Sequence, residues 1–135
     1  DVQFEGRLEI MSTTPRVLLD GAHNHAKMEF LARTLQDVFE YDRLIVVFGV
    51  KKKILQHLAP LVSTLIIAEP ALGHHRVVSA QEIAEYASEL GIKDVQIVKN
   101  PFDAVEKAKS LAGARDLVCV TGSLHLVGMV RNGLK

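Results

Sequence analysis

The sequence predicts an α/β domain in which a mostly parallel sheet of about six strands carries helices on both of its faces. Short apolar runs alternate along the chain with longer stretches whose apolar residues recur at helical spacing. The short runs are apolar throughout, which is typical of strands buried on both faces of a parallel sheet. The chain has 135 residues, which fits a single domain over residues 1–135.

Six segments are expected to form strands. They are residues 8–11, 17–19, 44–48, 65–68, 95–98 and 117–120. The first has no helix before it, so we expect it to run antiparallel at an edge of the sheet. Each of the other five leads into a predicted helix, and such units join parallel strands by right-handed crossovers. The arrangement is therefore expected to be Rossmann-like.

Five segments are expected to form helices. They are residues 24–39, 52–60, 79–90, 101–112 and 124–132. Residues 79–82 (Ser-Ala-Gln-Glu) have the form of a capping box. Asn100 and Pro101 supply a helix cap followed by a proline at the first helical position. Gly91 is expected to end the helix that begins at the capping box.

Composition excludes some classes of function. Sixteen basic and sixteen acidic side chains cancel, so no overall charge attracts nucleic acid or a membrane surface. No apolar run approaches the roughly 20 residues of a membrane span. Cys119, the single cysteine, lies in an apolar run and is expected to be a buried, unreactive side chain. A lone cysteine fits a reducing compartment, so we expect a cytoplasmic protein. The chain begins at Asp1 without a methionine, which suggests a fragment or a processed chain.

The loops after the strands are the candidate site, because ligands of open α/β sheets bind beyond the carboxyl ends of the strands. In residues 20–24 (Asp-Gly-Ala-His-Asn), Asp20 could contact a ribose and His23 could face an anion beside a helix N-terminus. Alternatively, Asn24 only caps the helix after a tight turn and His23 is an ordinary surface residue.

Residues 121–125 (Thr-Gly-Ser-Leu-His) form a second loop of this kind, between a predicted strand and a predicted helix. A glycine turn with a hydroxyl at a helix start makes a small pocket for an anion. Ser123 could equally be only a helix cap, and the two interpretations are compatible.

Two further loops carry cations. Residues 49–53 contain three consecutive lysines, which could neutralise phosphate or carboxylate, or could form only a solvated helix start. Residues 69–76 are long for a connection and end in Arg76, whose planar guanidinium suits a carboxylate. His74 and His75 are adjacent on this loop, which is a weak pattern for a metal, and no metal site is expected.

Neither a G-x-x-x-x-G-K-[ST] phosphate loop nor a G-x-G-x-x-G dinucleotide motif occurs in the chain. The domain is therefore not expected to carry out nucleotide chemistry alone.

Four segments, in order, resemble the C-terminal domain of folylpolyglutamate synthase and dihydrofolate synthase, members of the Mur ligase superfamily. They are residues 6–9 (Gly-Arg-Leu-Glu), 17–24 (Val-Leu-Leu-Asp-Gly-Ala-His-Asn), 69–79 (Glu-Pro, then Arg and Ser) and 120–128 (Val-Thr-Gly-Ser-Leu-His-Leu-Val-Gly). The similarity spans nearly the whole chain. The chain departs from the family pattern at His25, where proline is usual, and at His125, where tyrosine is usual. It also departs in residues 48–53, which lack the family's aspartates, and in residues 74–76.

The resemblance implies a Mur ligase C-terminal domain that belongs to an ATP-dependent ligase. In this family ATP phosphorylates a folate or pteroate carboxylate, and the amine of L-glutamate attacks the acyl phosphate to form an amide. The resemblance also implies an N-terminal ATP-binding domain, absent from this chain, with the phosphate loop and most of the Mg²⁺ ligands. The C-terminal domain would bind glutamate and close over ATP, so the isolated fragment is expected to be inactive.

Site residues follow from the resemblance by matching positions. Arg7 and Asp20 would contact ATP, through phosphate and ribose respectively. His23 would be the catalytic residue and would also lie on the glutamate side of the site. Asn24, Arg76 and Ser123 would complete the glutamate side.

Three other interpretations stay open on the sequence. One is a Mur-type ligase domain that acts on another acid. Another is a stand-alone, non-catalytic binding domain derived from such a ligase. A generic flavodoxin-like domain that binds a phosphorylated ligand would explain the fold but not the order of the four segments.

Overall fold

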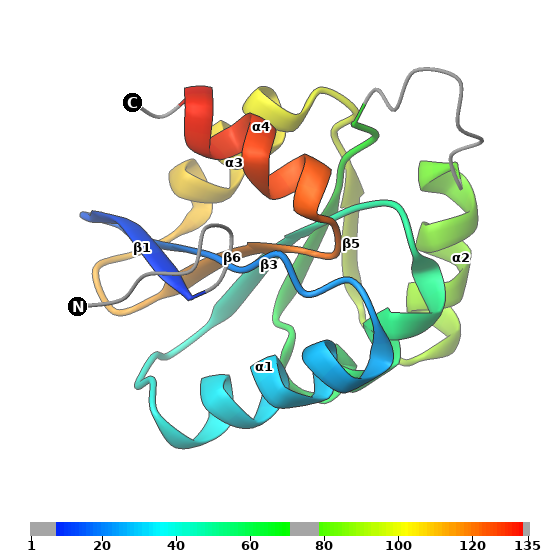
Figure 1. Ribbon diagram of the computed structural model, residues 1–135, viewed down its shortest axis with the longest axis horizontal. Coiled ribbons are helices and arrows are strands. Elements are labelled where there is room, and N and C mark those ends of the chain that lie inside the picture. The colour runs from blue at the N-terminus through cyan, green and yellow to red at the C-terminus, as the bar shows by residue number, and fades with distance from the viewer. Residues whose placement is uncertain (1–7, 71–78, 134–135) are drawn as a thin grey trace.

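A computed structural model describes residues 8–70 and 79–133 of the chain. In this range six strands form one sheet in the order β1-β2-β6-β3-β4-β5 (Figure 1). The strands are β1 (Glu9–Thr13), β2 (Arg16–Leu19), β3 (Leu44–Phe48), β4 (Thr64–Ile67), β5 (Asp94–Ile97) and β6 (Leu117–Thr121). β1 pairs antiparallel with β2 at one edge, and every other pairing is parallel. The predicted mostly parallel sheet with an antiparallel edge strand is confirmed.

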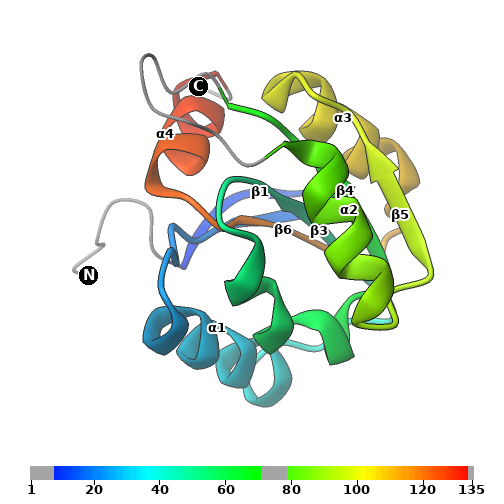
Figure 2. The ribbon, with the colours of Figure 1, turned by 90° about the vertical axis from the view of Figure 1, so that its right-hand side faces the viewer.

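Helices cover both faces of the sheet (Figures 1 and 2). The four α-helices are α1 (His25–Asp37), α2 (Ala80–Glu89), α3 (Pro101–Leu111) and α4 (Leu124–Gly133). Side chains of α1 and α2 pack in one hydrophobic layer, which we call the lower layer, and those of α3 and α4 pack in the upper layer on the opposite face. None of the helices in the described ranges is long and apolar enough to cross a membrane.

The central strands supply both layers at once. Leu44, Val46 and Phe48 of β3 enter the lower layer, whereas Ile45 and Val47 enter the upper layer. Successive side chains of a strand point to opposite faces of the sheet. A strand covered on both faces therefore has no solvated side, which explains why the sequence runs are apolar without alternation.

The prediction of one regular helix over residues 52–60 is wrong. Two short 3₁₀ helices, η1 (Lys52–His57) and η2 (Ala59–Leu61), occupy this segment. Pro60 has no N–H with which to continue an α-helical ladder. Leu55, Leu58 and Leu61 recur every three residues, and this spacing places them on one side of a 3₁₀ helix, where they pack in or against the lower layer.

The predicted helix starts are confirmed. The Asn24 side chain accepts a hydrogen bond from the Lys27 amide at the start of α1. The Ser79 side chain accepts one from the Glu82 amide at the start of α2. Asn100 accepts from two amides at the start of α3. Gly91 follows α2 with a φ of +90°, as expected of a residue that ends a helix in the left-handed region.

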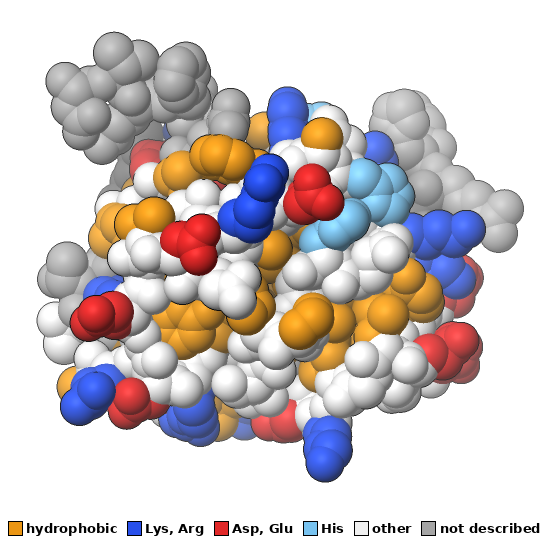
Figure 3. Space-filling view, turned by 90° about the horizontal axis from the view of Figure 1, so that it is seen from below, with side chains coloured by type: hydrophobic (Ala, Val, Ile, Leu, Met, Phe, Trp, Pro, Cys, Tyr) orange, Lys and Arg blue, Asp and Glu red, His pale blue; other side chains and the backbone are white. Residues whose placement is uncertain are grey.

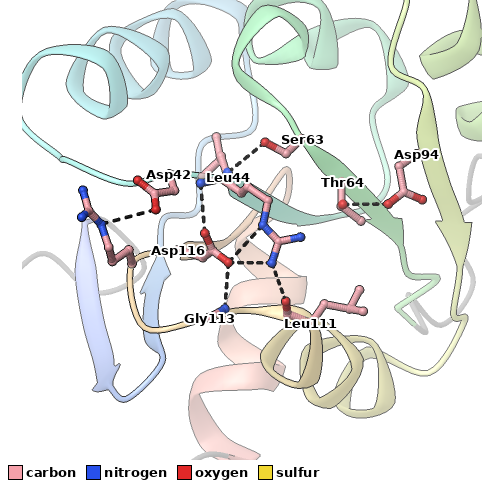
Figure 4. Close-up of polar contacts among 10 residues, drawn as sticks. Asp42, Leu44, Ser63, Thr64, Asp94, Leu111, Gly113 and Asp116 are labelled. Carbon is pink, nitrogen blue, oxygen red and sulfur yellow. Dashed lines mark hydrogen bonds and ion pairs between the residues drawn. The ribbon is translucent and has the colours of Figure 1, made fainter.

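The amino ends of β3 and β6 are held together by one buried carboxylate (Figure 4). Asp116 is 4% exposed, and its Oδ2 accepts hydrogen bonds from Arg43 Nη2 at 2.7 Å and from the Gly113 amide at 2.7 Å. Its Oδ1 accepts from the Arg43 amide at 3.1 Å. The hydrogen bond from the Arg43 guanidinium and the bond from Gly113 hold the pKa of Asp116 below its ordinary value. This cluster lies at the amino ends of the strands, whereas the loops predicted to form the site follow their carboxyl ends.

The order of the strands creates a switch point at β6, which lies between β2 and β3. From β2 to β5 the chain crosses on the lower face through α1, η1 and α2, and it then returns on the upper face through α3 to insert β6 between β2 and β3. Beyond their carboxyl ends, β3 continues into η1 below the sheet and β6 continues into α4 above it. In open α/β sheets, ligands bind where loops part in this way beyond the carboxyl ends of the strands.

Candidate functional site

The two loops that carry the most specific sequence segments meet at this switch point. Leu19 of β2 lies opposite Val120 of β6 in the parallel ladder. One residue further on, the Asp20 amide donates to the Val120 carbonyl at 3.0 Å. The Gly122 amide then donates to the Ala22 carbonyl at 3.2 Å. Residues 20–24 and 121–123, about a hundred positions apart in the chain, are thereby joined into one rim.

Glycine is required where this rim meets the end of β3. Gly122 has a φ of +105°, and a Cβ built there would lie 2.8 Å from the Gly49 carbonyl oxygen and from the Phe48 ring. A Cβ at Gly49 would in turn lie 2.8 Å from the carbonyl oxygen of Ala68. The loops after β6, β3 and β4 therefore touch through their backbones, and the rim has little freedom to move.

Asp20 is held at the end of β2 by backbone hydrogen bonds. It is 4% exposed. Its Oδ1 accepts from the Ala22 amide at 2.9 Å, and its Oδ2 accepts from the Leu8 amide at 3.1 Å. A carboxylate that accepts backbone N–H bonds on both oxygens is fixed in orientation. Asp20 therefore presents an oriented negative group at the switch point and ties the loop to the segment before β1.

His23 is half-buried, and its tautomer is set by the loop itself. Its Nδ1 lies 3.0 Å from the Gly21 carbonyl oxygen. Because a carbonyl only accepts, Nδ1 carries the proton in this hydrogen bond, and Nε2 of the neutral ring has the lone pair. The ring can therefore accept a proton or a hydrogen bond at Nε2 while the loop holds its orientation.

Asn24 and Ser123 both cap helices, as the local interpretation of each loop requires. The Asn24 Oδ1 accepts from the Lys27 amide at 2.9 Å. The Ser123 Oγ accepts from the amides of His125 at 3.1 Å and Leu126 at 3.2 Å, and the residue is 7% exposed. As an acceptor in both bonds, the serine keeps its hydroxyl proton to donate at the positive end of the α4 dipole.

Arg7 and Arg76 lie outside the described residues, as do His74 and His75. One hydrogen bond links the described residues on either side of the 71–78 segment. Glu69 Oε2 accepts from the Ala80 amide at 2.7 Å, and so adds a carboxylate to the N-terminus of α2.

The structure brings His25 together with a residue that sequence reasoning missed. The Nδ1 of His25 lies 2.9 Å from the Nε2 of His57, and the two rings meet edge to face at 80°. Figure 3 shows histidine side chains (pale blue) gathered on the face seen from below. The two residues are 32 positions apart, so no local spacing links them. The pair could have been predicted only if residues 25–37 and 52–57 had already been placed on the same face of the sheet.

Among the described residues, no group of three or more His, Cys, Asp or Glu side chains is arranged to hold a metal ion. Cys119 is fully buried, and burial, with a smaller contribution from the charge of Asp20, raises the pKa of its thiol. The prediction of a buried core cysteine is confirmed.

The comparisons with known proteins assign the family. Residues 6–124 match the family described as Mur ligase, glutamate ligase domain. This chain belongs to that family. It is 33% identical, over 98% of its length, to the dihydrofolate synthase/folylpolyglutamate synthase of Bacillus subtilis.

Solved structures show the same fold. The Mycobacterium tuberculosis folylpolyglutamate synthase complexed with ADP superposes with a TM-score of 0.87 at 30% identity over 98% of this chain. A bifunctional folylpolyglutamate synthase/dihydrofolate synthase with Mn, AMPPNP and L-glutamate bound superposes with a TM-score of 0.83 at 26% identity, again over 98% of this chain. The chain spans 31% of the Bacillus subtilis relative and 33% and 32% of the two solved chains, about a third of each.

Proposed function

We propose that this chain is the C-terminal, glutamate-binding domain of an ATP-dependent ligase that joins L-glutamate to a folate or dihydropteroate carboxylate. The observation that carries the proposal is the meeting of residues 20–24 and 121–123 at the switch point in a member of the glutamate ligase family. The relatives support the substrate class, since one solved relative was crystallised with an ATP analogue, Mn and L-glutamate.

The proposed reaction has two steps. The γ-phosphoryl group of ATP is transferred to the acceptor carboxylate, giving an acyl phosphate and ADP. The free amine of L-glutamate then attacks the acyl carbon, the C–N bond forms, phosphate leaves, and the amine loses a proton. Water must be excluded until this attack, because it would hydrolyse the acyl phosphate.

Residues of this chain supply positions for the second step. His23 Nε2 has the lone pair needed to accept the proton of the attacking amine, and its ring is oriented by Gly21. Ser123 offers a hydroxyl proton, at the positive end of α4, to a glutamate carboxylate. Asn24 fixes the loop through its cap, and we assign Arg76 to the second carboxylate because glutamate brings two negative groups.

The nucleotide side is shared with a domain outside this chain. We assign Asp20 to the ribose and Arg7 to a phosphate of ATP. We propose that an N-terminal ATP-binding domain outside this chain holds most of the Mg²⁺ ligands. Bound there, Mg²⁺ would neutralise charge on the phosphates. We further propose that the whole protein acts in the cytoplasm.

The test is ATP-dependent incorporation of L-glutamate by the full-length protein. Dihydropteroate and tetrahydrofolate should each be offered, together with a panel of unrelated acids that includes a peptidoglycan precursor. We expect ADP release that depends on glutamate and on a pterin acid. Turnover only with another acid would favour the Mur-type alternative. An open reading frame that begins at Asp1 would favour a stand-alone binding domain.

A further inference from the structure

The hydroxyl of Thr121 is a buried polar group without a described partner. Thr121 is the last residue of β6 and is fully buried. Its Oγ1 has no hydrogen-bond partner among the residues that the structure describes. Buried polar groups in folded proteins are almost always hydrogen-bonded, so an exception calls for an explanation. A role in function is one such explanation.

Thr121 stands at the switch point itself. It lies opposite Phe48, the last residue of β3, in the parallel ladder. The amide of the next residue, Gly122, donates to the Ala22 carbonyl within the rim. Thr121 therefore ends the strand that leaves the sheet toward the upper face, beside the end of β3, which leaves toward the lower face.

Packing gives no reason for a hydroxyl at this place. The residues that precede Thr121 in β6 are Leu, Val, Cys and Val, all fully buried. Valine is β-branched like threonine, favours strands as strongly, and would leave no polar atom unsatisfied. The hydroxyl is thus the only feature of Thr121 that the fold does not use.

Asp20 is the polar neighbour of Thr121 across the β2–β6 ladder. Leu19 and Val120 are register partners and both enter the upper layer. The residues that follow them, Asp20 and Thr121, are therefore directed to the lower side of the sheet. Cys119 also lies in the lower layer, and its pKa responds to the charge of Asp20. The carboxylate and the hydroxyl thus share one face at the ends of adjacent strands.

We propose that Thr121 is a positioning residue whose hydroxyl donates to the Asp20 carboxylate when nucleotide is bound, and so fixes that carboxylate toward the ribose. The inference rests on the proposed function, in which Asp20 contacts ATP. A carboxylate has about four acceptor positions, and the backbone amides of Ala22 and Leu8 fill two of those of Asp20. The proposal requires the Thr121 side chain to rotate about χ1 so that its hydroxyl turns toward β2.

The test uses the full-length protein with Thr121→Val, which removes the hydroxyl and keeps the shape. We expect the KM for ATP to rise about tenfold while kcat changes less than twofold. Thr121→Ser keeps the hydroxyl and should restore the KM. The melting temperature without nucleotide should stay equal to that of the wild type or rise, because an unsatisfied hydroxyl has been removed. Thr121→Ala serves as a second hydroxyl-free variant if the valine variant fails to fold.

A double-mutant cycle decides whether Thr121 acts through Asp20. In an Asp20→Asn background, Thr121→Val should raise the KM for ATP no further, because the partner of the hydroxyl is already altered. Additive effects would mean that Thr121 acts independently of Asp20 and would overturn the inference. An unchanged KM in Thr121→Val would overturn it as well, and so would a parallel loss of activity and melting temperature.

A second readout separates this inference from the proposed function. The Kd of a non-hydrolysable ATP analogue should rise in the same variants by a factor similar to that of the KM. If the wild-type enzyme transfers no glutamate to any pterin acid, the proposed function fails. The binding series then still tests the link between Thr121 and Asp20.

Discussion

At the scale of single residues, His23 is the side chain whose chemistry the loop prepares most fully. The contact of Nδ1 with the Gly21 carbonyl fixes the tautomer and directs the lone pair of Nε2 away from the turn. His23→Ala in the full-length protein should lower kcat by about 100-fold or more, the usual contribution of a positioned general base. His57→Ala removes a partly exposed histidine outside the proposed machinery and is the matched control. Near wild-type turnover in His23→Ala would make His23 only a loop residue.

Asp20 gives the corresponding prediction for the nucleotide. Asp20→Ala in the full-length protein should raise the KM for ATP strongly, because the oriented carboxylate at the end of β2 is lost. Steady-state kinetics at saturating glutamate would measure the change. Asp42→Ala removes an exposed aspartate near the amino end of β3, away from the proposed site, and should leave the KM for ATP unchanged. An unaltered KM in Asp20→Ala would remove Asp20 from the proposed site.

Single-residue roles were predictable from the sequence where the cause is local. Asn24 and Ser123 act as caps within three residues of their partners, and that pattern is visible in the sequence. The contact between His25 and His57 was not predictable, and neither was the burial of the Thr121 hydroxyl without a described hydrogen-bond partner. Both depend on segments that the fold brings together across the sheet.

At the scale of elements, the turn from β6 to α4 depends on the absence of a side chain at Gly122. Gly122→Ala should destabilise the protein by about 3 kcal/mol, because the new methyl group meets a backbone oxygen and a core ring in a left-handed backbone conformation. Chemical denaturation would measure the free energy of unfolding. Gly128→Ala lies within α4 with nothing within 4 Å of the new Cβ, and should stabilise the helix by up to about 1 kcal/mol. Equal stability of the two variants would contradict the packing described for the rim.

The elements themselves were predicted closely where burial and caps agree. The bounds of β3 were predicted to the residue. The predicted helix over residues 24–39 extended past the end of α1 at Asp37, because apolar Val38 and Phe39 continued the helical pattern. The segment after β3 was predicted as a single helix because its apolar residues fit a helical stripe. A spacing of three and a single proline separate a 3₁₀ helix from an α-helix, and a short stretch offers few residues to tell them apart.

At the scale of the whole molecule, the two ends of the sheet have different tasks. The carboxyl ends of β2, β6 and β3 carry the candidate site, while the amino ends of β3 and β6 are clamped by Asp116 (Figure 4). The clamp holds together the two strands between which the chain changes faces. The sequence could not predict it, because Arg43 and Asp116 are 73 residues apart.

The clamp predicts a pH dependence of stability. The folded-state pKa of Asp116 lies below its ordinary value of 3.8, so its contribution is fully present above that value and is lost as the pH falls through the folded pKa. Asp116→Asn should lower the melting temperature by about 5 °C at pH 7. The difference from the wild type should shrink as the pH falls below 3.8 and on through the lower folded-state pKa, where Asp116 of the folded wild type takes up a proton. A difference that stays constant from pH 7 to pH 3 would show that the charge of Asp116 is not what stabilises the clamp.

The final prediction concerns what one domain can do alone. The chain contains no phosphate-loop motif, and its described residues contain no ligand cluster for a metal ion. In the proposed function a second domain brings ATP to the site at the switch point and excludes water from it. The 135-residue chain alone, given ATP, Mg²⁺, L-glutamate and dihydropteroate, should therefore form no amide detectable by chromatography. The full-length protein is the positive control, and amide formation by the chain alone would overturn the division of the site between two domains.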